Sequence, residues 1–174
     1  SLADRVRTLV LGQDRAGKFL WNVTRAMLVY SANRIPEIAD DIVQVDNAIR
    51  WGFNWEMGPF ELWDALGVRS SVERMKADGI AVPDTIDAML AAGAESFYKR
   101  DGGRTSYWDF ASSSYVDVAD RAGVLVLGDL KDRDRIVKKS AGASLVDLGD
   151  GVACVEFHSK MNAIGGDTIA MLNA

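Results

Sequence analysis

The first half of the chain places apolar residues at helical spacing, most densely over residues 16–34. Two apolar stripes run along this segment, one with Phe19, Leu20, Val23, Met27 and Tyr30 and the other with Trp21, Leu28 and Ala32. Apolar groups therefore cover much of the helix circumference. A helix of this kind is expected to lie centrally and to be covered on several sides.

Caps and breakers predict further helices downstream. Their expected ranges are 41–51, 59–67, 70–79 and 83–92, and the helical part is expected to end near Arg100. Asp41 is suited to an N-cap, and Gly52 can close the same helix in the left-handed conformation. Pro59 has its φ preset for a first helical turn. The segment Ser70-Ser71-Val72-Glu73 has the spacing of a capping box.

Five aromatic side chains cluster around the break between two of these helices. They are Trp51, Phe53, Trp55, Phe60 and Trp63. Rings of this size contribute enough apolar area to anchor two helices against each other. We therefore expect this aromatic corner to hold the helical part together.

The pattern changes to short β-type runs after residue 101. Residues 106–110 and 115–117 are expected to pair as a small hairpin, and residues 143–148 and 152–157 as a second one through a Gly-Asp-Gly turn. Both faces of the last strand are largely apolar. The second hairpin is therefore expected to dock on the helical part or to self-associate. Residues 168–172 begin a helix that the chain end cuts short, so the chain is expected to be truncated.

Composition excludes several classes of partner. Apolar residues make up 48% of the 174 positions, and the formal charge is −5 with both signs interspersed. No basic patch is available for nucleic acid. No apolar run reaches the ~18 residues of a membrane span, so we expect no membrane partner. Cys154 is the only cysteine, so no intrachain disulfide is possible, and a cytoplasmic protein is expected.

The residues that could take part in catalysis or ligand binding are expected to have structural roles instead. Residues 12–18 fit seven positions of a phosphate-binding loop after a strand-like segment at 9–11, but Phe19 stands where the loop needs Ser or Thr. No glycine-rich dinucleotide motif follows a strand. His158 is the only histidine and lacks spaced ligands, and the acid pairs Asp40/Asp41 and Glu61/Asp64 suit helix caps and solvated faces. No catalytic, cofactor-binding or metal-binding residue is assigned.

Three segments carry a family resemblance. The run Gly52-Phe53-x-x-x-Met57-Gly58-Pro59-Phe60-Glu61-Leu62-x-Asp64-x-x-Gly67 resembles the helical C-terminal domain of the 3-hydroxyacyl-CoA dehydrogenase family. Residues 33–41 and 46–48 resemble the second such domain of multifunctional dehydrogenase and hydratase fusions. Residues 152–164 resemble the opening strand and turn of a crotonase-type enoyl-CoA hydratase. The three segments occur in the order of such a fusion.

The resemblance implies a mainly α fold, with a helical dehydrogenase C-terminal-type domain followed by a small β appendage of hairpins. The implied divisions are a linker over 1–15, the helical domain over 16–100, a connecting segment over 101–142 and a truncated crotonase-like start over 143–174. The parent would oxidise 3-hydroxyacyl-CoA with NAD and hydrate enoyl-CoA in fatty-acid β-oxidation. The fragment alone is expected to be inactive.

The resemblance also implies partners and one candidate site residue. Asn22 corresponds in place to an Asn of the first helix that helps position substrate, although Val23 stands where the family has Arg, which favours a polar helix position. Implied partners are the adjacent nucleotide-binding and crotonase domains, acyl-CoA, and a second copy in a homo-oligomer. An independent helical interaction module with a β appendage remains the alternative.

Overall fold

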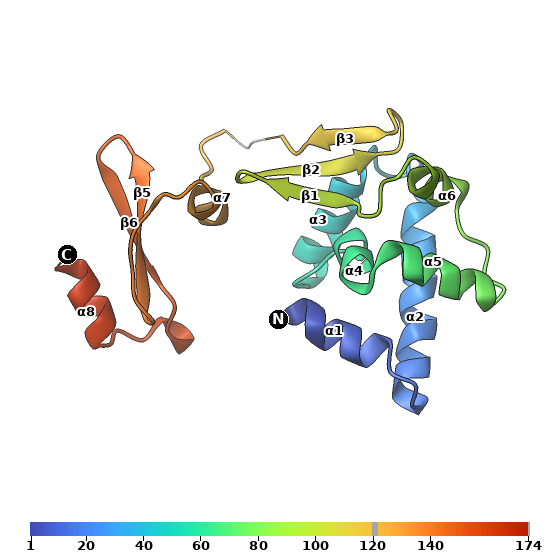
Figure 1. Ribbon diagram of the computed structural model, residues 1–174, viewed down its shortest axis with the longest axis horizontal. Helices are drawn as coiled ribbons and strands as arrows, with labels where there is room; N and C mark the ends of the chain where they lie inside the picture. Colours follow the sequence, from blue (N-terminus) through green and yellow to red (C-terminus); the bar gives the residue numbers. More distant parts are fainter. Residues whose placement is uncertain (120–121, 174) are drawn as a thin grey trace. The chain divides into compact units, whose positions relative to one another are not determined.

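The computed structural model describes residues 1–119 and 122–173, and the chain divides into two compact units (Figure 1). Unit 1 combines Ser1–Lys99 with Ser106–Val118, and unit 2 combines Arg100–Thr105 with the chain from Ala119 onward. Within the described residues, none of the helices has both the length and the apolar character needed to cross a bilayer. The observed helices and small antiparallel sheets agree with the predicted class, mainly α with a small β appendage.

Unit 1 is built from helices. They are α1 (Leu2–Val10), α2 (Arg15–Ala32), α3 (Ile42–Phe53), α4 (Pro59–Leu66), α5 (Val68–Ala77) and α6 (Asp84–Ala91). The helices predicted over 16–34, 41–51, 59–67 and 83–92 are confirmed with small shifts at their ends. Asp41 is the N-cap of α3, and its carboxylate accepts a hydrogen bond from Gln44 N at 2.9 Å. Pro59 occupies the first turn of α4 as expected.

Two predicted helix ends are wrong. Helix α3 continues through Gly52 to Phe53, and its C-cap is Asn54, whose φ of 56° is left-handed. Asn is one of the few residues besides Gly that adopts this conformation readily. Helix α5 begins at Val68, directly after Gly67 with φ of 90°, so the capping box predicted at Ser70 is not used. The Ser70 hydroxyl donates a hydrogen bond to Gly67 O instead.

Helix α1 occupies most of the segment predicted as a linker. Ser1 caps it, and Ser1 and Asp4 form a capping box. The Arg7 guanidinium donates two hydrogen bonds to Ala65 O, at 2.7 and 3.1 Å, and so ties α1 to the end of α4. Residues 1–10 therefore belong to the helical unit, and the strand-like reading of residues 9–11 is wrong because Val10 is the last residue of the helix.

The core of unit 1 lies between the helices and a small sheet. Its largest fully buried side chains are Leu28, Ile42, Phe60, Trp63, Met75, Ile86, Met89 and Phe97. The Phe97 ring stands edge-on to Phe60 with centroids 5.0 Å apart and lies 5.3 Å from Trp63. The prediction of an aromatic core is therefore correct for Phe60 and Trp63 of the corner.

The other three rings of the corner face solvent. Trp51, Phe53 and Trp55 are 62%, 69% and 48% exposed. Helix α2 also departs from expectation. It buries the face with Trp21 and Leu28, and Leu20 and Met27 beside that face are partly buried against the core. The prediction that α2 is covered on several sides is wrong for the side with Phe19, Val23 and Tyr30, which is exposed.

A three-stranded antiparallel sheet follows the helices. Its strands are β1 (Tyr98–Asp101), β2 (Arg104–Asp109) and β3 (Ser114–Asp117), in that spatial order. Tyr107 lies opposite Val116 and Trp108 lies opposite Tyr115, which confirms the first predicted hairpin. The glycine-rich segment at 102–103 is the turn between β1 and β2.

Unit 2 contains the second predicted hairpin. Its elements are α7 (Leu127–Asp132), β4 (Ile136–Lys139), β5 (Ala143–Gly149), β6 (Val152–Phe157), the 3₁₀ turn η1 (Lys160–Asn162) and α8 (Gly166–Leu172). The pairing of Leu145 with Val155 confirms the hairpin, and all three turn residues have positive φ. Strand β4 pairs with β5, and α7 and α8 pack on the hairpin. The hairpin thus has cover within its own unit, which the sequence did not predict.

Candidate functional site

The family-like run over residues 52–67 surrounds the start of α4, where a buried carboxylate meets the helix. Asp46 of α3 is 2% exposed. Its carboxylate accepts hydrogen bonds from Phe60 N at 2.8 Å and Glu61 N at 3.1 Å, and a third from Tyr98 Oη at 2.8 Å. The first N–H groups of a helix have no partner within the helix and carry partial positive charge. Asp46 therefore caps α4 from outside the helix.

Two more carboxylates hold backbone in the same region. Glu61 accepts from Gly58 N at 2.8 Å and pairs with Arg50 at 3.1 Å. Asp64 accepts from Phe97 N at 2.7 Å and Tyr98 N at 2.9 Å. The three acids, called here the carboxylate cluster, are Asp46, Glu61 and Asp64. They fasten α3, α4 and the start of β1 to one another.

Burial changes the acidity of this cluster. Loss of hydration raises the pKa of Asp46 to about 7 and that of Asp64 to about 6, against the opposing effect of their hydrogen bonds. Burial beside Asp46 also raises the pKa of Tyr98. Raised carboxyl pKa values often mark catalytic acids. Here the Asp46 carboxylate is enclosed and already accepts three internal hydrogen bonds, so no reactant can reach it.

Stability is expected to rise as the pH falls through the neutral range. The folded-state pKa values of Asp46 and Asp64 lie above the ordinary value of 3.8, so the folded chain binds more protons than the unfolded chain between about pH 4 and 7. The free energy of unfolding should increase by roughly 4 kcal/mol from pH 8 to pH 5 and level off below about pH 4. Urea unfolding at several pH values measures this. A midpoint that is constant or falls over this range would contradict it.

Asp64→Asn and Asp46→Asn provide the controls for this pH dependence. Each variant removes one titrating group, so each should flatten the part of the curve near the pKa of that group. The residual slope then belongs to the other carboxyl. If both variants keep the slope of the parent, the titrating groups lie elsewhere.

Asn22, the candidate substrate-positioning residue, lies on the exposed side of α2. It is not part of the carboxylate cluster, because α2 turns a different face to the core. Its neighbour Trp21 is buried and donates from Nε1 to Asp78 at 2.8 Å, while the Arg74 guanidinium covers the indole ring at 4.2 Å. The role of Asn22 stays a prediction.

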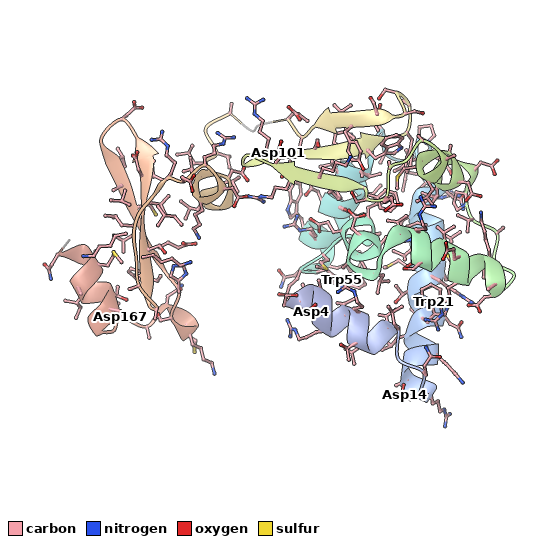
Figure 2. The ribbon with its side chains drawn as sticks, in the orientation of Figure 1. Asp4, Asp14, Trp21, Trp55, Asp101 and Asp167 are labelled. Atoms are coloured by element: carbon pink, nitrogen blue, oxygen red, sulfur yellow. The ribbon has the colours of Figure 1, made fainter. Side chains whose placement is uncertain are left out.

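The segment at residues 12–18 combines the end of the turn between α1 and α2 with the first turn of α2. Asp14 caps α2 and accepts from Gly17 N at 2.7 Å (Figure 2). A Cβ at Gly17 would lie 2.2 Å from Gly12 O, so the second glycine is required by close approach of the backbone. Helix α1 and not a strand precedes this turn. The strand that precedes a phosphate-binding loop is therefore replaced by a helix at this position.

A polar contact in unit 2 was not foreseen. Ser144 Oγ lies 2.7 Å from His158 Nε2, and a Glu156 carboxylate oxygen lies 3.7 Å from the same nitrogen. A catalytic triad needs the acid on the other ring nitrogen. Ser144 is also 1% exposed. The contact therefore joins β5 to the residue after β6, and the structural role of His158 stays a prediction.

Metal binding finds no support in the described residues. Residues 1–119 and 122–173 contain no group of three or more His, Cys, Asp or Glu side chains placed to hold an ion.

The sequence did not predict Asp46 as the central residue of the carboxylate cluster. The available signal was its position four residues after Ile42, on the buried face of α3, where an unpaired carboxylate would be costly.

Comparison with known proteins adds the remaining information. No protein-family profile and no solved structure matches the chain. The chain is 45% identical over 169 residues, 97% of its length, to a probable 3-hydroxyacyl-CoA dehydrogenase of Bacillus subtilis. This identity supports the similarity of the chain to the 3-hydroxyacyl-CoA dehydrogenase family. The chain spans 21% of this relative. The chain is also 33% identical over 54 residues to a putative fatty acid oxidation complex trifunctional enzyme of Rickettsia felis. That alignment covers 31% of the chain and 8% of the relative.

Proposed function

We propose that the chain is a non-catalytic part of a fatty-acid β-oxidation enzyme. The complete protein would oxidise 3-hydroxyacyl-CoA with NAD and hydrate enoyl-CoA. The observation that carries the proposal is the 45% identity over 97% of the chain to a probable 3-hydroxyacyl-CoA dehydrogenase of which the chain spans 21%. A cytoplasmic location is part of the proposal.

The helical domain over residues 16–100 would be the second C-terminal-type domain of that enzyme, and residues 143–174 would begin a crotonase-like domain. The arrangement around α4 supports a packing role, because Gly58, Glu61 and Asp64 of the family-like run all serve backbone contacts. The domain would shape the acyl-CoA cleft or make dimer contacts. Asn22 is exposed and would be the residue nearest to substrate.

NAD does not fit the residues of this chain. Dinucleotide binding uses a glycine-rich turn between a parallel strand and a helix. In the described residues the pairings of β2 with β3, β4 with β5 and β5 with β6 are antiparallel, and Gly12 and Gly17 lie in close backbone contact after a helix. The nucleotide-binding domain of the parent would therefore hold the cofactor, and no reaction step is assigned to this chain.

An independent helical interaction module with a β appendage is the second candidate. The exposed aromatic residues Trp51, Phe53 and Trp55 favour it, because exposed apolar groups in one region mark interaction sites. Reading the parent gene separates the two. A nucleotide-binding domain upstream and crotonase sequence downstream are required by the first candidate only.

The 174-residue chain is expected to show neither dehydrogenase nor hydratase activity. Asp46 is enclosed, Glu61 and Asp64 hold backbone and Arg50, and Asn22 alone supplies no acid or base, so the groups for both reactions would lie elsewhere in the parent. The assay follows NADH formation from a 3-hydroxyacyl-CoA and loss of a trans-2-enoyl-CoA, with the full-length protein as the positive control. Turnover above buffer that survives repurification of the chain would refute the non-catalytic role.

A further inference from the structure

Helix α2 carries a second apolar face, opposite the face it buries. Its members, called here the α2 stripe, are Phe19, Val23, Ala26 and Tyr30. Phe19, Val23 and Tyr30 are 65%, 53% and 63% exposed, and Ala26 is also exposed. Steps of four, three and four residues keep the stripe within an arc of about 60° over about 17 Å of helix.

The α2 stripe differs from ordinary exposed apolar residues because its members are contiguous. Single apolar side chains on a surface are normal, whereas contiguous patches mark contacts with other molecules or domains. Helices α1 and α4 pack against α2 within unit 1 (Figure 1). Helix α2 therefore has two apolar faces, and unit 1 buries one of them.

We propose that the α2 stripe is covered by an apolar surface in the part of the parent polypeptide that lies outside these 174 residues. The proposal rests on the proposed function, in which the chain is one segment of a longer enzyme. The relative aligned over 97% of the chain has about four-fifths of its own length outside the alignment, since the chain spans 21% of it. That length is ample for a further packed domain.

The size of the stripe favours a tethered partner over a second copy. Aromatic side chains bury ~150–250 Å² each, so the exposed parts of Phe19, Val23 and Tyr30 together amount to roughly 300–400 Å². A stable complex of separate chains buries about 800 Å² on each partner. A neighbour in the same polypeptide has an effective concentration near the millimolar range, so a small interface is enough to hold it.

The flank of the stripe suits a packed interface. Asn22 and Asn33 lie eleven positions apart on one side of it, and both are exposed. On the other side the Arg34 guanidinium lies over the Tyr30 ring at 5.0 Å. Amide and guanidinium groups around an apolar centre match the polar rim of protein interfaces.

Hydroxyl-radical footprinting tests the proposal on the 174-residue chain and on the full-length protein. Phe19 and Tyr30 should be oxidised readily in the isolated chain and at least about fivefold more slowly in the full-length protein. Phe60, which is fully buried, should be protected in both and serves as the reference. Light scattering gives the mass of the isolated chain in the same buffer.

Each other outcome overturns the proposal. Equal oxidation in both proteins would show that the α2 stripe stays open. Protection in the isolated chain at monomer mass would place the cover within these residues, and protection at dimer mass would make a second copy the occupant. Dehydrogenase activity of the full-length protein is measured separately, so an open stripe in an active enzyme refutes this inference alone.

A pair of glutamine variants gives a second, independent readout. Val23→Gln places an amide in the stripe, and Lys18→Gln places the same group on the exposed flank of α2. In the isolated chain each variant should shift the thermal midpoint by about 2 °C or less. In the full-length protein only Val23→Gln should lower it, by about 4 °C or more. Equal shifts for Val23→Gln in the two proteins would contradict the proposal.

Discussion

Gly58→Ala is expected to destabilise unit 1 by roughly 3–5 kcal/mol. A Cβ at this position would lie 2.4 Å from the Cα, Cβ and Cγ atoms of Asp46. Part of this obstacle is backbone, so α3 and α4 would have to separate. Separation would also weaken the hydrogen bonds from Phe60 N and Glu61 N to the Asp46 carboxylate. Urea unfolding followed by circular dichroism measures the loss.

Gly52→Ala is the matched control for this prediction. Both glycines belong to the family-like run, but a Cβ at Gly52 would meet nothing within 4 Å. Gly52 lies inside helix α3 and is exposed, so alanine should stabilise the helix by roughly 0.5–1 kcal/mol. Similar losses for the two variants would show that close contact with Asp46 is not the reason for glycine at position 58.

Local signals predicted the helices and hairpins well. Asp41, Pro59 and the Gly-Asp-Gly turn each act through contacts within a few residues, and the structure confirms all three. The helix end predicted at Gly52 was wrong because both Gly52 and Asn54 can adopt the left-handed conformation, and Asn54 is the one that does so. The choice depends on how far packing continues α3, which composition alone does not determine.

Contacts between distant residues could not be predicted. Asp64 accepts from the backbone of Phe97, and Trp21 donates to Asp78 across 57 positions. Neither pair leaves a spacing pattern in the sequence. Glu61 and Asp64 were therefore interpreted as caps and solvated faces, although tertiary packing partly buries Asp64 and raises its pKa.

Burial of the aromatic corner was predicted for five rings, and two of them are buried. Phe60 and Trp63 lie on the face of α4 that meets Phe97, whereas Phe53 ends α3 and Trp55 follows it in the connection to α4 (Figure 2). Ring size predicts the gain from burial but not which rings are buried. The exposed rings and the α2 stripe are the positions where apolar patterning and observed burial disagree.

Phe60→Ala is expected to cost roughly 3–5 kcal/mol, because it removes a fully enclosed ring and leaves a cavity that the core cannot fill. Phe60 is 0% exposed, and its ring lies 5.0 Å from Phe97 and 6.4 Å from Phe110. These contacts join α4 to the segment before β1 and to the end of β2. Loss of the ring should therefore loosen the helices and the first sheet together.

Phe53→Ala is the matched control, since it removes the same atoms from a side chain that is 69% exposed. Its effect on the free energy of unfolding should stay within about 0.5 kcal/mol. Thermal unfolding of both variants and the parent measures the difference, with near-ultraviolet circular dichroism reporting on the aromatic packing. A Phe60→Ala midpoint within about 2 °C of the parent would mean that the core tolerates the cavity. The ring contacts between α4, Phe97 and Phe110 would then not be what stabilises unit 1.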